Sequence, residues 1–299
     1  MLALSAGADS TALFFICRLL APRLGLELQA AHLNHGLRPE AKEEAQFLQD
    51  LCSCCAIPLY TGSTRADLFA ARTGRGVEEA GRVLRYRFLA GVKEKTEADY
   101  IFTAHHQNDL AEDMLLRLLR GSGWPELSGM KAHESNKSVV RPLLATSKES
   151  LLDLLHSTGE QWHEDPSNQD TRFLRNRVRH WILPVLQREN PNFLDQVLNL
   201  WKLGSADRAA LEKHLKELRT REKFLPEGTL LPEKELRCLS RSLRLRWIKD
   251  ALLRVGPGQA LADNLFRLER SWREKRRNAL FQFPGGKKAK ITRKGILLS

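Results

Sequence analysis

Features that would mark a membrane or secreted protein are missing from this sequence. No stretch approaches 18 uncharged apolar residues, so no membrane-spanning helix is expected, and the first residues lack the pattern of a signal peptide. Cysteine is scarce, with five in 299 residues and no regular spacing. A disulfide framework is therefore not expected, and a reducing compartment is favoured. The sequence predicts a cytoplasmic protein with no membrane partner, long enough for two domains.

Acidic charge is in short supply only in the last third of the chain. Residues 191–299 contain 25 Lys and Arg against 12 Asp and Glu, a net charge of +13, whereas residues 1–190 have a net charge of −1. A neutral part joined to a basic part indicates a polyanionic partner, most plausibly a nucleic acid. The alternative is a solvated helical surface that happens to be rich in Lys and Arg.

Short apolar runs alternate with helical patterns through the first part of the chain. This alternation predicts an α/β fold with a parallel sheet covered on both faces. Ligands of such sheets lie beyond the carboxyl ends of the strands. The expected strands are residues 1–4, 26–33, 58–62 and 100–104, and the expected helices include 39–55, 77–95, 110–119 and 148–157.

The turn after the first expected strand reads Ser5-Ala6-Gly7-Ala8-Asp9-Ser10. Small residues between a strand and a helix let backbone N–H groups approach a phosphate, and Ser5 and Ser10 add hydroxyl donors. The Asp9 carboxylate would repel phosphate, so its expected role is to hold Mg²⁺ against the phosphates. No lysine lies in the turn, which excludes a Gly-Lys-Ser phosphate loop. The alternative is an ordinary turn with a Ser/Asp helix cap.

A second polar stretch, residues 105–112, follows another expected strand. His105 and His106 precede a helix whose first turn has Asp109 and Glu112 three residues apart, so both carboxylates share one face. Carboxylates beside imidazoles suit Mg²⁺ binding or orientation of an amine nucleophile. Helix capping explains the pattern equally well, and both interpretations stay open.

Three further groups of side chains are candidates for ligand contact. His32 ends an expected strand and could contact a nucleotide base or ribose, although a hydrogen-bonded turn explains it too. Arg85 lies on a helix and could hold phosphate, whereas solvated charge pairs are the alternative. Arg175, Arg177 and Arg179 occupy alternate positions of an expected helix, so they cannot all face one ligand.

Together these stretches resemble the N-type ATP pyrophosphatases. Residues 5–10 are similar to the SGGxDS pyrophosphate-binding loop, and residues 105–112 resemble the HHxDDxxET signature of the tRNA(Ile)-lysidine synthetases within that superfamily. Residues 117–123 match its RLLRGSG continuation, while residues 162–168 and 175–179 resemble its W-x-E-D-P-S-N and R-N-x-x-R segments. Two departures stand out: Ala6 replaces a glycine, and Asn108 replaces the first aspartate of the pair. If position 6 requires a positive φ, alanine costs about 1 kcal/mol or more there.

The resemblance implies a PP-loop (Rossmann-like) catalytic domain over residues 1–190 and a basic, mainly helical tRNA-binding domain, ending in a β-hairpin, over residues 191–299. It implies ATP-dependent ligation of lysine to C2 of the wobble cytidine of tRNA(Ile) with a CAU anticodon. The reaction would proceed through an adenylated cytidine and release AMP and pyrophosphate. ATP, Mg²⁺, L-lysine and this tRNA are the implied ligands, and the sequence leaves a homodimer open.

The resemblance also assigns roles to individual residues. Ser5, Ala6, Gly7, Ala8, Asp9, Ser10 and His32 would bind ATP, with Asp9 on Mg²⁺. His105, Asp109 and Glu112 would orient lysine or assist proton removal, and Arg85 with one of Arg175, Arg177 and Arg179 would hold the cytidine or a phosphate. Arg241 and Arg244, which lie near tryptophans, would contact tRNA by phosphate binding or base stacking. An amphipathic helical bundle is equally compatible with that Trp spacing.

Two other functions remain open from the sequence. A tRNA thiolase of the same superfamily would need a cysteine persulfide carrier or an Fe–S cluster. The cysteine pair at hand, Cys52 and Cys55, lies in a helical pattern that favours buried thiols. A tRNA-binding paralogue without ATP turnover is the second alternative, motivated by Ala6, Asn108 and the short first strand.

Overall fold

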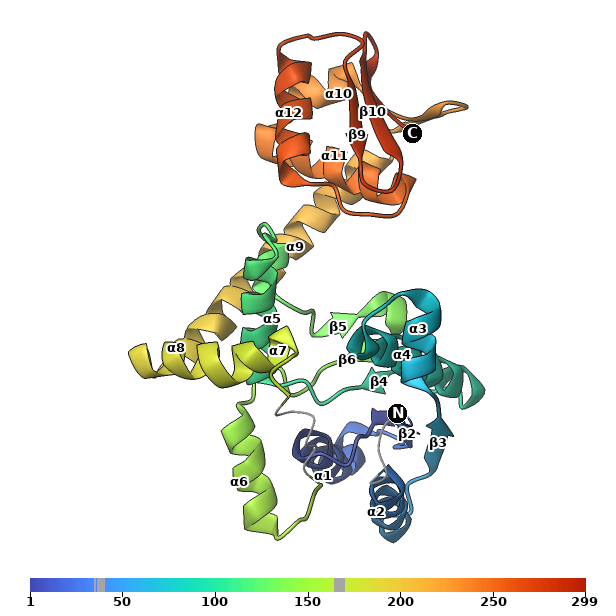
Figure 1. Ribbon diagram of the computed structural model, residues 1–299, viewed down its shortest axis with the longest axis vertical. Helices are drawn as coiled ribbons and strands as arrows, with labels where there is room; N and C mark the ends of the chain where they lie inside the picture. The colour runs from blue at the N-terminus through green and yellow to red at the C-terminus, as the bar shows by residue number, and fades with distance from the viewer. Residues whose placement is uncertain (35, 37–40, 164–169) are drawn as a thin grey trace. The chain divides into compact units, whose positions relative to one another are not determined.

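The computed structural model describes residues 1–34, 36, 41–163 and 170–299, which form two compact units, Met1–Ser205 and Ala206–Ser299 (Figure 1). The predicted division at residue 190 falls earlier in the chain, because helix α9 (Phe193–Arg219) begins in the first unit and continues into the second. Among the described helices, none is long and apolar enough to cross a membrane.

The first unit is built on a six-stranded sheet in the order β3-β2-β1-β4-β6-β5. All neighbouring strands are parallel except β5, which is antiparallel to β6. The predicted parallel α/β fold is therefore confirmed. The strands are β1 (Leu2–Ala3), β2 (Ala30–Asn34), β3 (Leu59–Ser63), β4 (Ile101–Phe102), β5 (His133–Glu134) and β6 (Val139–Val140).

Both faces of this sheet are buried, as expected from its apolar strands. Leu2 packs in one hydrophobic cluster and the next residue, Ala3, in another, because successive side chains of a strand point to opposite faces. Helices α1 (Ala8–Leu24), α2 (Ala41–Cys54) and α6 (Lys148–Thr158) contribute to the first cluster, and α4 (Val77–Lys95) contributes to the second. Helix α3 (Ala66–Thr73) precedes α4.

Helix α5 (Gln107–Leu119) connects the sheet to the last helices of the first unit. Leu110 and Met114 of α5 pack with Leu183 of α8 (Leu183–Glu189) and Val197 of α9. Just before α8, the chain forms α7 (Leu174–Arg177) and a π-helical turn, Val178–Ile182. This packing holds the arginines of residues 175–179 beside the first turn of α5.

The second unit combines helices with a five-stranded antiparallel sheet in the order β7-β8-β11-β10-β9. Its elements after α9 are β7 (Lys223–Leu225), β8 (Gly228–Pro232), α10 (Glu233–Cys238), α11 (Arg241–Val255), α12 (Ala262–Arg273), β9 (Leu280–Phe283), β10 (Lys287–Thr292) and β11 (Gly295–Leu298). The expected terminal hairpin is β9–β10, turning through Gly285 and Gly286 at positive φ. Strands β7 and β8 were not expected, because their runs are short: β7 stops before Pro226 and β8 ends at Pro232.

Candidate active site

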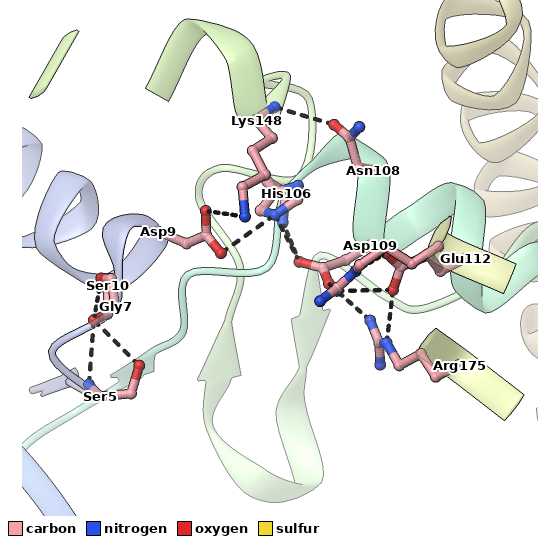
Figure 2. Close-up of polar contacts among 11 residues, drawn as sticks. Ser5, Gly7, Asp9, Ser10, His106, Asn108, Asp109, Glu112, Lys148 and Arg175 are labelled. Carbon is pink, nitrogen blue, oxygen red and sulfur yellow. Dashed lines mark hydrogen bonds and ion pairs between the residues drawn. The ribbon is translucent and has the colours of Figure 1, made fainter. Parts of the chain in front are cut away.

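The Ser5–Ser10 turn links β1 to the N-terminus of α1, as the sequence predicts. Ser10 Oγ donates to the Gly7 carbonyl oxygen at 3.0 Å and accepts a hydrogen bond from the Ser5 backbone N–H at 3.2 Å. The side chain of Ser10 thereby closes the turn (Figure 2). Gly7, the N-cap of α1, makes no side-chain cap hydrogen bond, so no cap side chain covers the N-terminus of this helix, where an anion can bind. A Cβ at Gly7 would lie 3.7 Å from Ser5 Oγ, an ordinary contact distance.

Ala6 adopts the left-handed conformation that the comparison with the SGGxDS loop anticipates. Its φ is +60°, and its side chain is fully buried in the hydrophobic cluster beside α1. Its carbonyl oxygen accepts a hydrogen bond from the His163 N–H at 3.0 Å. Strain of about 1 kcal/mol is thus offset by burial of a methyl group, worth roughly 0.8 kcal/mol, so alanine is accommodated at this position.

His106 joins the two sequence motifs. Its Nε2 lies 3.5 Å from Asp9 Oδ2 and 3.4 Å from Asp109 Oδ2, and its backbone N–H donates to Asp109 Oδ2 at 3.1 Å (Figure 2). Burial opposes the charged imidazole, but the contacts with Asp9 and Asp109 raise its pKa above the ordinary value. A positively charged His106 between Asp9 and Asp109 lets these two carboxylates, from distant parts of the chain, lie close together. The capping interpretation of Asp109 is also correct, since Asp109 accepts the N–H that precedes α5.

Two arginines bind the carboxylates of α5. Arg175 Nε donates to Glu112 Oε2 and Arg175 Nη2 to Asp109 Oδ1, both at 2.7 Å, while Arg179 Nε donates to Glu112 Oε1 at 2.6 Å. Although burial alone would raise the pKa of Asp109, the charges of His106 and Arg175 hold it well below its usual range. Asp109 is therefore a permanent anion, suited to positioning cations and unsuited to accepting a proton.

Residue spacing explains which of the three arginines reach the carboxylates. Arg175 and Arg179 are four apart and share a face, whereas Arg177 Nη1 donates to the carbonyl oxygens of Thr171 and Arg172 at 2.9 and 2.8 Å. The expectation that the three could not face one ligand agrees with this arrangement. Arg177 is held by its own loop instead.

Arg85 and two histidines lie near this cluster with polar atoms left over. In the described ranges, Arg85 has no hydrogen bond or ion pair, and burial lowers its pKa. His32 Nδ1 lies 3.1 Å from the Leu4 carbonyl oxygen, while its buried Nε2 lacks a partner among the described residues. Burial also lowers the pKa of His105 to about 3, and its Nδ1 lies 2.9 Å from Thr103 Oγ1. His105 is therefore a neutral imidazole and too weak a base to hold a proton at neutral pH.

The start of α6 adds residues that sequence reasoning missed. The backbone N–H of Lys148 donates to Asn108 Oδ1 at 3.0 Å, and Lys148 Nζ lies 3.9 Å from Asp9 Oδ1 (Figure 2). His106 was noted in the sequence but given no role. Lys148 is a basic residue at the start of an expected helix, which is a signal that the sequence contains. The contact with Asp9 was missed because the two residues lie far apart in sequence.

In the second unit, the structure corrects the interpretation of Arg244 and of the tryptophans. Arg244 is buried, binds Glu269 Oε1 through Nη2 at 2.8 Å, and lies over the Trp272 ring at 4.7 Å. Trp247 and Trp272 are buried as well, so none of the three is available to stack on a base. Arg241 remains exposed beside the same glutamate. The amphipathic-helix interpretation is the correct one for this cluster.

The cysteines do not form a reactive pair. Cys52 is buried in α2, and burial raises the pKa of its thiol to about 11, which keeps it protonated. The prediction of buried thiols is confirmed for Cys52, whereas Cys55 is only partly buried. In the described parts of the chain, no three His, Cys, Asp or Glu side chains are grouped to hold a metal ion. Residues 164–168 of the W-x-E-D-P-S-N segment, and His35, lie outside the described residues.

Comparisons with known proteins match the sequence to a family. Residues 1–186 match the PP-loop domain family. A tRNA(Ile)-lysidine synthase from Nitratidesulfovibrio vulgaris is 42% identical over an alignment covering all of this chain and 91% of the relative. A tRNA(Ile)-lysidine synthase from Geobacter sulfurreducens is 35% identical over 84% of this chain, but only 54% of that relative is covered. The chain thus spans about half the length of the second relative.

A solved structure supports the fold independently. The U34-tRNA thiolase NcsA from Methanococcus maripaludis superposes with a TM-score of 0.55 over 67% of this chain and 69% of its own, at 16% identity. At this identity the likeness is one of fold.

Proposed function

Because this chain belongs to the tRNA(Ile)-lysidine synthase family, we propose that it ligates L-lysine to C2 of the wobble cytidine of tRNA(Ile) with a CAU anticodon. ATP would activate the C2 oxygen by forming an adenylated cytidine and releasing pyrophosphate. The lysine ε-amine would then attack C2 and displace AMP. The observation that carries the proposal is the convergence of Asp9, His106 and Asp109 at the end of the parallel sheet.

The Ser5–Ser10 turn is the proposed site of the ATP phosphates. The backbone N–H groups at the start of α1 would bind the phosphates, because a helix N-terminus attracts anions. His32 lies in the neighbouring strand β2, and its Nε2, which has no hydrogen-bond partner among the described residues, would contact the nucleoside.

Asp9 fits the predicted role of a magnesium ligand. Its Oδ1 is buried and lacks a hydrogen-bond partner among the described residues, while Oδ2 faces His106. Mg²⁺ binds proteins through one or two carboxylates together with substrate phosphates, so a single free carboxylate oxygen suffices. When bound, the ion would neutralise charge on the phosphates.

Arg85 is proposed to hold the activated cytidine or a phosphate. Arg85 is partly buried and lacks a counter-ion in the described structure, so it is prepared to pair with an anionic group of the substrate. A preorganised cation in a partly buried site stabilises developing negative charge without the cost of reorganising water.

Asp109 and Glu112 are proposed to position the lysine and the substrate phosphate rather than to remove a proton. Asp109 stays ionised, and both carboxylates hold Arg175 and Arg179 in fixed orientations. The neutral His105 would accept a hydrogen bond from the lysine amine. The lysine ε-amine must lose a proton before it attacks. Because neither Asp109 nor His105 would hold that proton, it would pass to solvent.

The second unit is proposed to bind the tRNA backbone, with the reaction taking place in the cytoplasm. The net charge of +13 in residues 191–299 favours phosphate contact that weakens with salt. Arg241, whose side chain is 56% exposed, remains a candidate for this contact, whereas the buried Arg244 is removed from the proposal.

The test is incubation of the full chain with ATP, Mg²⁺, radiolabelled lysine and transcribed tRNA(Ile) with a CAU anticodon, followed by counting of label in RNA. We expect incorporation that disappears when the wobble cytidine is replaced by uridine. Binding of the tRNA without incorporation or pyrophosphate release would instead support the paralogue without ATP turnover. A Cys52→Ser/Cys55→Ser double variant should retain the activity, whereas a thiolase would lose its own.

A further inference from the structure

The phosphate turn of this protein has no cation of its own. Phosphate loops of the Gly-Lys-Ser type place a lysine within the loop, where it reaches the β- and γ-phosphates. Here the turn contains Asp9 and no lysine, although ATP would bring several negative charges to it. In the described structure two basic side chains reach the turn from elsewhere in the chain: His106, which lies between Asp9 and Asp109, and Lys148, whose only ion-pair partner among the described residues is Asp9.

Lys148 is held beside the turn by contacts between two helix starts. Its backbone N–H donates to Asn108 Oδ1 at 3.0 Å, and the N–H of Gln107 donates to the Thr146 carbonyl oxygen at 2.9 Å. The start of α6 is thereby fixed to the start of α5, and Lys148 is directed at the Ser5–Ser10 turn. Asn108 provides this contact as a neutral amide, so it adds no negative charge near the phosphates.

The ammonium group of Lys148 is near the turn but only weakly engaged. Its Nζ is 3.9 Å from Asp9 Oδ1, beyond hydrogen-bond distance, and 42% of its side chain is exposed. Among the described residues, Asp9 is its only ion-pair partner. A magnesium ion on Asp9 Oδ1 would take that partner away and leave the ammonium free to pair with a phosphate.

We infer that Lys148 binds the β- or γ-phosphate of ATP and stays with the pyrophosphate as it leaves. This inference rests on the proposed function, because it assigns a residue to the adenylation step. The cytidine C2 oxygen forms a bond to the α-phosphorus, the bond from that phosphorus to the bridging oxygen breaks, and its electron pair remains on pyrophosphate. Lys148 then neutralises the charge that appears on the leaving group.

The experiment measures the binding of three ligands, namely ATP and its two parts AMP and pyrophosphate, to the wild-type chain and to the Lys148→Met variant. Radiolabelled ATP, AMP and inorganic pyrophosphate are titrated in the presence of Mg²⁺ and the absence of tRNA. We expect ATP and pyrophosphate to bind about tenfold more weakly or worse, as for loss of one charge-assisted contact, and AMP to bind as in the wild type. Lys148→Arg should restore most of the affinity for pyrophosphate.

Two matched variants separate this role from a general effect. Lys137→Met removes a lysine of similar exposure (46%), paired with Glu134 elsewhere in the first unit, and should change none of the three affinities. Asn108→Ala removes the acceptor that positions Lys148 and should weaken pyrophosphate binding by a smaller factor than Lys148→Met.

Equal weakening of ATP and AMP by Lys148→Met would overturn the inference, because it would indicate a structural role, and so would unchanged pyrophosphate binding. These measurements need neither tRNA nor lysine. If Lys148→Met selectively loses pyrophosphate binding while the wild-type protein incorporates no lysine, the Lys148 assignment is retained and the proposed function is rejected.

Discussion

Each unit of the protein contains a cluster of arginine and carboxylate side chains, and the two clusters differ in how much of the arginine is exposed. In the second unit, Arg244 and Glu269 are 9% and 1% exposed, and Arg244 also donates to the carbonyl oxygens of Leu236 and Leu239. In the first unit, Arg175 keeps 23% of its side chain exposed and faces the candidate active site. The same pairing chemistry therefore lies in the core of one unit and at the candidate active site of the other.

The largest expected effect tests the structural cluster. Arg244→Met should lower the free energy of unfolding by about 3 kcal/mol or more, because it leaves the Glu269 charge buried without its main partner. Denaturant unfolding of the full chain measures it. Arg241→Met removes the exposed partner of the same glutamate and should cost under about 1 kcal/mol. Equal losses would mean that burial does not distinguish the two arginines.

Removal of Arg175 tests the site cluster. Arg175→Met should lower kcat/KM for lysine incorporation by about 100-fold, with a smaller loss of stability than Arg244→Met, because Arg179 still pairs with Glu112. Steady-state kinetics and denaturant unfolding on the same preparation check both parts. A stability loss as large as that of Arg244→Met, with kinetics unchanged in the folded fraction, would place Arg175 among the structural arginines.

Arg85 should separate function from stability most clearly. Arg85→Met should lower lysine incorporation by about tenfold or more, while stability stays the same or rises, because no described partner is lost and an unpaired half-buried charge is removed. The measurements are label incorporation and the urea midpoint. Wild-type incorporation by the folded variant would remove Arg85 from the mechanism.

A partly buried cluster at the edge of the first sheet, Glu134 with Lys137 and Arg141, gives an expected dependence on pH. Burial opposes ionisation of Glu134, but hydrogen bonds from Lys137 and Arg141 lower its pKa to about 2. A lowered pKa in the folded state stabilises the protein above about pH 4.5, and this contribution is lost as the pH falls toward 2. The stability difference between wild type and Glu134→Gln should therefore shrink between pH 6 and pH 3 in urea titrations; a constant difference would contradict this.

The smallest effect is expected at Ala6. Ala6→Gly relieves left-handed strain but loses a buried methyl group and loosens the unfolded chain, so stability should change by less than about 1 kcal/mol. The KM for ATP should change less than about threefold. Thermal unfolding and ATP titration measure these values, and a tenfold gain in ATP affinity would show that alanine impairs the turn.

Local sequence patterns predicted much of the first unit. Helix α4 has the predicted bounds of 77–95, and the two polar motifs follow the ends of β1 and β4, as expected. Alternating apolar runs and small-residue turns depend on neighbours in sequence, which explains this success. In the second unit, strands β7 and β8 escaped prediction because each is short and gains its hydrogen bonds from sheet pairing, with β8 bound to the distant β11.

Local pattern and composition were enough to predict the parallel α/β architecture, the turn of residues 5–10 between a strand and a helix, the residue types at the candidate site and the uneven charge. Which charges meet depends on tertiary packing. It buried Arg244 against Glu269, placed Arg175 and Arg179 on Asp109 and Glu112, and brought Lys148 to Asp9. Ion pairs between distant residues depend on packing and on exclusion of water, and the residue types alone determine neither.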